Sequence, residues 1–350
     1  MNILVTGGAG YLGSVLIPKL LVRGHKVRVV DLGYFGMGHL RNMRPEVVVL
    51  SEDLRRAMID PDFTHALLDG VDCVIHLAAM SNDPSAELQP DLTEDINFHT
   101  TVALARAARA KGIRFLFSSS CSVYGEAAGQ LDENGPTNPL TVYAISKLKA
   151  ERDLEQLADD SWRPTILRNG TLFGFSQRMR FDLVVNIFSL YATLYNEIRI
   201  FGDGMQWRPF LHIADCARAF VFLAEKPDLR HIRYNVCHQN LRVIDVAEIL
   251  RELRPGLQVI HMPTQDTDTR NYAVSGQRLA EEGFQPQVDV RTGAEEMMDT
   301  IVSGAIPDPE SVFYRNAKWL DALTHIGSFQ HRDIVGLMEN FTAAHHAGRR

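Results

Sequence analysis

Residues 6–13 read T-G-G-A-G-Y-L-G, and this stretch decides the expected fold. The apolar residues 3–5 before it predict a strand, and the apolar residues after it recur at the spacing of a helix. Gly7, Gly10 and Gly13 follow the pattern G-x-x-G-x-x-G, in which the backbone bends tightly and aims helix N–H groups at a pyrophosphate. The stretch therefore predicts a dinucleotide-binding unit made of a strand, a glycine turn and a helix.

An acidic residue follows at the distance that such a unit requires. A second apolar run, residues 26–30, ends at Asp31, 18 residues after Gly13. A carboxylate there can accept hydrogen bonds from both ribose hydroxyls of an adenosine and would repel a 2′-phosphate. NAD is therefore favoured over NADP, although Asp31 could instead only cap a turn.

Further apolar runs at residues 46–50 and 71–77 alternate with helical patterns, which indicates βαβ units and a parallel sheet. Asp53 follows the first run, where it could meet an adenine amino group or cap a helix. The second run leads into H-L-A-A at 76–79, which would line the cofactor at the end of a strand. His76 could equally be a buried imidazole with hydrogen-bond partners.

The middle of the chain supplies candidate catalytic groups. Residues 87–110 predict one long helix, and residues 113–117 predict a strand that ends in a serine cluster at 118–120, on the sheet edge where ligands bind. Tyr143 and Lys147 lie four residues apart on a predicted helix and share one face. Because a lysine ammonium beside a phenol favours the phenolate, the pair could transfer protons near neutral pH.

The composition is that of a soluble globular enzyme, with 45% hydrophobic residues, 23% charged residues and a mean hydropathy of -0.10. No run approaches the ~20 apolar residues of a membrane span, and residues 1–8 lack the basic start of a signal peptide, so the mature chain is expected to begin near Met1. The formal charge of -7 argues against nucleic acid as a partner. The four cysteines are widely separated and suggest neither a metal site nor a disulfide framework, which favours a cytoplasmic location.

Five motifs in order resemble the extended short-chain dehydrogenase/reductases that act on nucleotide sugars. They are the glycine stretch, Asp31, H-L-A-A at 76–79, S-S-S-x-x-V-Y-G at 118–125 and Y-x-x-x-K at 143–147. The match at hand is the UDP-galactose 4-epimerase and dTDP-glucose 4,6-dehydratase group, over most of residues 1–285. The resemblance implies an α/β fold with a doubly wound parallel (Rossmann) sheet, a smaller C-terminal substrate-binding lobe, NAD as cofactor, a nucleotide-sugar substrate and a homodimer packed through helix 87–110 and the helix of Tyr143.

The same resemblance divides the chain. Residues 1–168 are expected to form the NAD-binding domain, to which 207–240 return, and residues 169–206 and 241–306 the substrate-binding lobe. A helical pattern begins at Arg178, and the resemblance implies that Phe181, Leu183 and Val184 contact the nucleotide base. Residues 307–350 form a C-terminal extension of unknown role, with apolar residues spaced so as to pack.

Carried over to matching positions, the resemblance implies Tyr143 as the catalytic acid/base, Lys147 as the residue that lowers its pKa and holds the nicotinamide ribose, and Ser120 as the hydroxyl that orients the reacting oxygen. The implied cofactor contacts, besides Tyr143 and Lys147, are Gly7, Gly10, Tyr11, Leu12, Gly13, Asp31, Asp53, Leu54, Leu77, Ala78 and Ala79. The implied substrate contacts are Met80, Ser81, Ser122, Thr171, Leu183, Arg208 and Arg270, with no metal.

Arginines suit the phosphate contacts because their planar fork meets phosphate oxygens in a bidentate way. Arg208 matches one phosphate-binding arginine of the family, and Arg270 matches a second less closely; either could also be a surface arginine paired with an acidic neighbour. Thr171 stands where many members carry an asparagine.

The positions after Ser120 help to choose the reaction. Dehydratases of the family carry Asp-Glu there, whereas this chain has Cys121 and Ser122, which disfavours both a 4,6-dehydratase and a UDP-glucuronate decarboxylase. The leading hypothesis is an NAD-dependent nucleotide-sugar epimerase that acts through a transient keto-sugar. The alternatives are an NAD(H)-dependent reductase or dehydrogenase of a keto-sugar nucleotide and a non-catalytic dinucleotide sensor.

Overall fold

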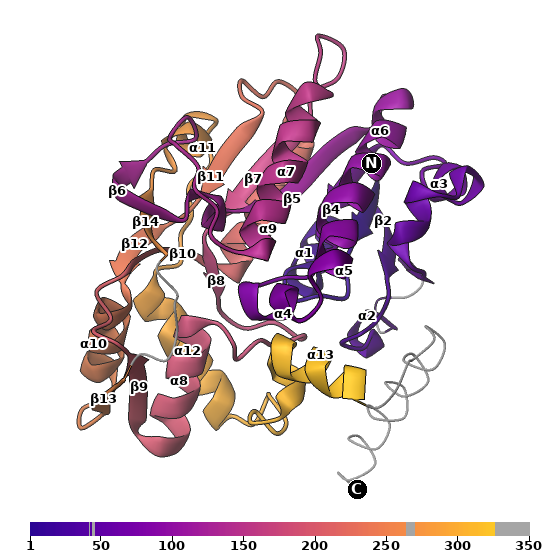
Figure 1. Cartoon of the computed structure of the whole chain (residues 1–350). Helices are drawn as coiled ribbons and strands as arrows, with labels where there is room; N and C mark the ends of the chain where they lie inside the picture. The colour runs from indigo at the N-terminus through magenta and orange to yellow at the C-terminus, as the bar shows by residue number, and fades with distance from the viewer. Residues whose placement is uncertain (42, 44–45, 264–269, 326–350) are drawn as a thin grey trace, which may run out of the picture.

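The computed structural model describes residues 1–41, 43, 46–263 and 270–325 (Figure 1). Its centre is a seven-stranded sheet in the order β11-β7-β5-β4-β1-β2-β3, in which every pair of neighbouring strands is parallel. The strands are β1 (Asn2–Thr6), β2 (Lys26–Asp31), β3 (Val47–Ser51), β4 (Cys73–His76), β5 (Arg114–Ser120), β7 (Thr165–Asn169) and β11 (Arg233–Val236).

Apolar side chains on both faces of this sheet are buried, as a parallel sheet requires. On β1, Ile3 and Val5 join one core and Leu4 joins the core on the opposite face. The helices around the sheet are α1 (Gly13–Val22), α2 (Gly38–Arg41), α3 (Pro61–Leu67), α4 (Asp83–Leu88), α5 (Pro90–Glu94), α6 (Thr100–Ala110), α7 (Val142–Gln156), α9 (Ile213–Glu225) and α11 (Gln277–Glu281). The predicted doubly wound α/β fold is confirmed.

A smaller lobe stands at one edge of the large sheet (Figure 1). Its own apolar core joins α8 (Val184–Tyr195), α10 (Val243–Leu253) and α12 (Val290–Val302). Outside the large sheet, β10 (Trp207–His212) lies between β8 (Thr171–Phe173) and β12 (Gln239–Arg242) and pairs with both. Two further pairs are β9 (Glu197–Phe201) with β13 (Gln258–Met262) and β6 (Glu126–Leu131) with β14 (Asn271–Val274).

Within residues 207–240, β11 lies in the large sheet and α9 packs on α1. Strand β10 pairs outside that sheet, with β8 and β12. None of the described helices is long and apolar enough to cross a membrane. The last described helix, α13 (Asn316–His325), lies beside α4 and follows a short turn, Val312–Tyr314 (Figure 1).

Two helix predictions were wrong in their extent. The single helix predicted at 87–110 is broken at Gln89, because Pro90 excludes the helical conformation from the residue before it and starts a new helix. A π-helical turn, Asp95–His99, then precedes α6 and turns Asn97 inward. The helix predicted from Arg178 begins only at Val184, since the residues before it form a loop along the cleft.

Candidate active site

The carboxyl ends of the central strands open into a cavity of about 1300 Å³ between the large sheet and the smaller lobe. The chain order reverses at β1, since β2 and β3 lie on one side of it and β4, β5, β7 and β11 on the other, and ligands bind at such a switch point. The sequence-predicted residues that line this cleft are Gly7, Gly10, Tyr11, Leu12, Gly13, Asp31, Asp53, Leu54, Leu77, Ala78, Ala79, Met80, Ser81, Ser120, Ser122, Tyr143, Lys147, Thr171, Leu183, Arg208 and Arg270. The fold therefore brings all of these residues into one cleft.

The glycine turn forms a cradle at one end of the cleft. Gly7 has a φ of +68°, and a Cβ there would lie 2.6 Å from the backbone nitrogen of Ala78, so a side chain would push β1 away from the end of β4. A Cβ at Gly13 would lie 2.4 Å from the carbonyl oxygen of Gly8. The turn can therefore stay closed only with glycines, and it presents the N-terminus of α1 to the cleft, which suits a dinucleotide pyrophosphate.

Asp31 closes the same end. Its carboxylate accepts hydrogen bonds from the backbone of Ala9 at 3.0 Å and of Gly33 at 2.8 Å. Burial raises the pKa of Asp31, and these two N–H groups oppose the rise. The carboxylate is thus fixed against the glycine turn at the position where an adenosine ribose is expected.

Asp53 and His76, two predicted neighbours of the cofactor, have protein partners for their side chains. Asp53 caps the turn Leu54–Met58 and pairs with the guanidinium of Arg55 at 2.5 Å, so the capping alternative describes its contacts. His76 does not line the cleft, because its imidazole lies between the hydroxyls of Thr6 at 2.7 Å and Thr101 at 2.8 Å. Burial lowers the pKa of His76 to about 3, which keeps it a neutral structural residue.

The catalytic candidates meet where β5 ends beside α7. The Ser120 hydroxyl accepts a hydrogen bond from the backbone of Ser122 at 3.1 Å, and its side chain lies close enough to Tyr143 to lower the pKa of the phenol. The Thr141 side chain caps α7 and sets where this helix begins. Ser120 and Tyr143 are thus held in contact by a strand end and a helix start.

Lys147 is buried one turn after Tyr143. Its Nζ donates to the carbonyl of Ser118 at 2.9 Å and lies 5.9 Å from the centroid of the Tyr143 ring. Burial lowers the pKa of Lys147 to about 7. Ser118 is the one hydrogen-bond acceptor for Lys147 among the described residues, which leaves donors for a ribose. That Lys147 lowers the pKa of Tyr143 stays a prediction.

The environment of Tyr143 favours the neutral phenol. Burial raises the pKa of Tyr143 to about 12, and the carboxylate of Asp83 adds to this rise. The side chain of Ser120 and the positive charges of Arg180 and Arg270 oppose it. Asp83 also pairs with Arg270 and accepts a hydrogen bond from Thr141. The acidity of the phenol therefore depends on residues from four separate segments.

Replacing Asp83 with asparagine is expected to lower the pKa of Tyr143, because it removes the negative charge that disfavours the phenolate and keeps Arg270 nearby. If the reaction needs Tyr143 as a base, kcat/KM rises with pH as the phenol ionises. This rising limb of the pH profile should move to lower pH in Asp83→Asn. A pH profile of kcat/KM tests this, with Asp159→Asn, an exposed residue paired with Arg109, as the control. An unmoved or upward-moved limb would contradict it.

The two predicted phosphate-binding arginines lie on one wall of the cleft. Arg208 is buried and donates from Nη1 to the carbonyl of Trp207 at 2.9 Å and to the carbonyl of Arg270. Arg270 carries the ion pair with Asp83 across the cleft. Both guanidinium groups are therefore positioned by the protein itself.

Site residues that the sequence reasoning missed lie in the loop before α8. Arg178, Arg180 and Asp182 line the cleft, and Arg180 forms two hydrogen bonds of 2.9 Å with Asp182. The alternating charges of R-M-R-F-D at 178–182 were a signal, but the helical pattern concealed it. Phe181, predicted near the nucleotide base, is instead buried in the main core and packs edge-on against Tyr314.

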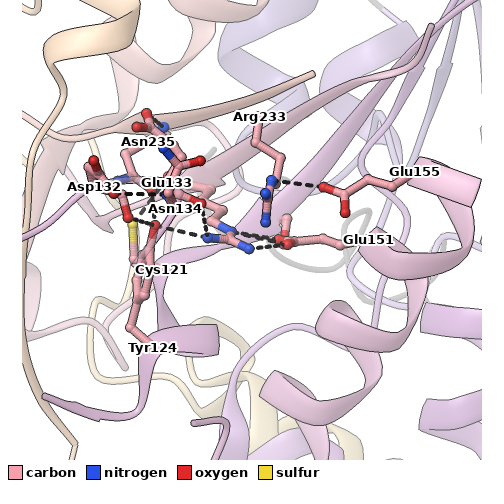
Figure 2. Close-up of polar contacts among 11 residues, drawn as sticks. Cys121, Tyr124, Asp132, Glu133, Asn134, Glu151, Glu155, Arg233 and Asn235 are labelled. Carbon is pink, nitrogen blue, oxygen red and sulfur yellow. Dashed lines mark hydrogen bonds and ion pairs between the residues drawn. The ribbon is translucent and has the colours of Figure 1, made fainter. Parts of the chain in front are cut away.

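A buried polar network lies between α7, the helix of Tyr143 and Lys147, and the strands of the large sheet (Figure 2). Glu151, one turn after Lys147, receives three hydrogen bonds of 2.5–3.0 Å from the guanidinium of Arg168 and one from the hydroxyl of Ser119. Arg168 also donates to the hydroxyl of Tyr124 at 2.9 Å, which in turn donates to Asn235 at 2.8 Å. The network joins α7 to β5, β7 and β11 and so fixes Lys147 relative to the strand ends.

The family follows from comparison with known proteins. A model of the NAD dependent epimerase/dehydratase family matches residues 3–237. The chain belongs to this family. It is an enzyme of the extended short-chain dehydrogenase/reductase type, and its cofactor is NAD.

Individual relatives of this family member catalyse different reactions. The chain is 31% identical to the UDP-glucose 4-epimerase of Mycolicibacterium smegmatis over 84% of this chain and 96% of that protein. It is 26% identical to UDP-glucuronic acid decarboxylase 1 of Arabidopsis thaliana over 85% of this chain and 69% of that protein. The solved structure of MoeE5 in complex with UDP-glucuronic acid and NAD is 27% identical, with a TM-score of 0.73 over 87% of this chain and all of that chain.

Proposed function

We propose that this enzyme is an NAD-dependent nucleotide-sugar epimerase that acts through a transient keto-sugar. The observation that carries the proposal is the contact of Ser120 with Tyr143 beside a buried Lys147, without carboxylates in the two positions after Ser120. The relatives support the broader conclusion that the enzyme modifies a nucleotide sugar with NAD. NAD, when bound, accepts a hydride from a sugar carbon and can return it.

The residues of this chain supply the proton transfer that accompanies such a hydride transfer. Tyr143 takes the hydroxyl proton as the carbonyl forms and gives it back when the carbonyl is reduced. Ser120 can donate a hydrogen bond to the sugar oxygen while its charge develops. A turn of the keto-sugar between the two steps would give the epimer with no net oxidation.

The positions after Ser120 offer little for an elimination. Cys121 is buried and donates from Sγ to the carbonyl of Arg168 at 3.2 Å, and burial raises the pKa of its thiol far above neutral. Ser122 is also buried, and its Oγ has no hydrogen-bond partner among the described residues, although it lines the cleft. A buried hydroxyl without a partner suits a polar group of the sugar.

The test is an assay of the purified enzyme with UDP-glucose, UDP-galactose, UDP-glucuronic acid, UDP-galacturonic acid and dTDP-glucose. We expect one pair to interconvert, with no net change in the absorbance of reduced nicotinamide. Product formed together with stoichiometric NADH would instead favour the dehydrogenase or reductase, and a deoxy-keto product would favour a dehydratase.

We also propose a homodimer packed through the region of α7. Leu88, Leu140 and Ile145 are each 40–41% exposed on or beside α4 and α7, and a partner chain packed on this region would cover them. Light scattering of the purified enzyme should give the mass of two chains, and the mass of one chain would contradict the proposal.

A further inference from the structure

Residues 311–325, here called the C-terminal segment, reach back to the cofactor end of the cleft. Trp319 and Leu323 of α13 pack with Tyr34 and Phe35, which follow β2, and the indole nitrogen of Trp319 donates to the carbonyl of Tyr34 at 2.7 Å. In Figure 1 this helix, in yellow, lies between α4 and α2. The segment thus joins the two sides of the cleft entrance.

Asn316 is the residue through which the segment enters the site. It is 3% exposed, and each of its polar groups contacts a cleft residue. Its Oδ1 accepts a hydrogen bond from Nη2 of Arg178 at 2.5 Å, its Nδ2 donates to the Ser81 hydroxyl at 3.1 Å, and its backbone N–H donates to the carboxylate of Asp182 at 3.3 Å. Asn316 therefore contacts three residues from two different loops, two through its side chain and one through its backbone.

Arg178 is a buried cation whose hydrogen bonds are incomplete. It is 2% exposed, its Nη1 donates to the carbonyl of Met179 at 3.3 Å, and its Nε has no partner among the described residues. The guanidinium lies 3.7 Å over the ring of Phe35. A buried donor without an acceptor costs free energy, and this donor belongs to a residue that lines the cleft, so an anionic ligand would remove the cost.

The neighbours of Arg178 place it at the cofactor end rather than at the sugar end. The hydroxyl of Ser176 donates to the carbonyl of Tyr11 at 2.8 Å, which holds the loop before Arg178 against the glycine turn. The charge of Arg178 also acts on Asp31 and on His39, both of which lie at or beyond the end of β2. An arginine fork there faces the part of the cleft in which the N-terminus of α1 favours a diphosphate.

We propose that the C-terminal segment completes the NAD site, with Arg178 as a ligand of the cofactor diphosphate and Asn316 as the positioning residue that aims it. This inference depends on NAD binding and not on which reaction the enzyme catalyses, so the substrate panel and the test below can fail separately. A nucleotide sugar also carries a diphosphate, so the test compares both ligands.

The test measures release of NADH from the holoenzyme by the loss of bound-NADH fluorescence after dilution into excess ADP-ribose. Charge-assisted hydrogen bonds contribute enough that Arg178→Gln should release NADH about 10- to 100-fold faster. Asn316→Ala should accelerate release by a smaller factor, and it should add less than about 2-fold when Arg178 is already glutamine, because it acts through that arginine. Arg291→Gln, which removes an exposed arginine paired with Glu252, is the matched control and should leave release unchanged.

Binding of UDP, measured by calorimetry on the same variants, separates the two diphosphates. Unchanged UDP affinity with faster NADH release supports the proposal, whereas lost UDP affinity with unchanged NADH release would assign Arg178 to the substrate. If Asn316→Ala accelerated NADH release by the same factor in the wild-type protein and in Arg178→Gln, Asn316 would not act through Arg178. That result would overturn its role as a positioning residue. Should Arg178→Gln not fold, Arg178→Lys keeps the charge without the fork, and unchanged NADH release in that variant would overturn the proposal.

Discussion

Replacing Tyr143 with phenylalanine is expected to lower kcat by about 10²- to 10⁴-fold, the range that a general acid–base group contributes. The substitution removes only the hydroxyl that exchanges the proton with the sugar. The ring stays between Ser120 and Lys147, so the shape of the cleft should persist. Turnover of whichever nucleotide sugar the panel identifies is the measurement.

The affinity for NADH separates a catalytic role of Tyr143 from a structural one. It should change little in Tyr143→Phe, because the glycine turn, Asp31 and Lys147 remain in place. Tyr191→Phe, which alters a tyrosine of α8 that also lines the cleft, serves as the matched substitution. Activity retained in Tyr143→Phe would remove the catalytic argument, whatever the other variants do.

Replacing Glu151 with alanine is expected to destabilise the fold by about 3–5 kcal/mol, the cost of leaving a buried charge without its partner. Arg168 is fully buried and would keep its charge, with the Tyr124 hydroxyl and the distant carbonyl of Glu133 as its remaining acceptors among the described residues. Thermal and urea unfolding of the two proteins would measure the loss. Because α7 carries Tyr143 and Lys147, weaker activity should accompany it.

Glu155 provides the control, since it lies one turn further along α7 and pairs with Arg233 at 2.8 Å (Figure 2). Its side chain and that of Arg233 are about one third exposed, at 30% and 29%, so Glu155→Ala should cost only about 0–1 kcal/mol. A double replacement, Glu151→Leu with Arg168→Met, removes both charges and should recover much of the stability. Equal losses in Glu151→Ala and Glu155→Ala would contradict the importance of burial.

The cofactor-binding part of the cleft could be predicted from local sequence patterns. Strands, glycine turn and helix follow one another within residues 1–31, so a few adjacent residues determine where Gly7, Gly13 and Asp31 lie. The spacing of Tyr143 and Lys147 on one helix is local in the same way. Parallel strands then bring their carboxyl ends to one edge, where the glycine turn, Asp31 and Ser120 line the same cleft.

The break in the helix predicted at 87–110 was a local effect of Pro90, whereas the omissions from the site arose where contacts join distant segments. Asp83 meets Arg270 across 187 positions, and Asn316 meets Arg178 across 138. The spacing of residues in the sequence does not predict such contacts, because they depend on how the smaller lobe and α13 pack against the large sheet. The same packing turned Phe181 into the core and left Arg178 in the cleft.

The sequence by itself determined the fold class, the family resemblance and the preference for NAD, and it predicted the catalytic set, since these rest on neighbouring residues whose spacing is set by helix and strand geometry. Only the tertiary structure decided what surrounds them: the charges that act on Tyr143, the buried pair of Glu151 and Arg168, and the C-terminal segment beside Arg178. Burial and long-range charge are properties of the packed chain, so they became visible only when its distant parts were brought together.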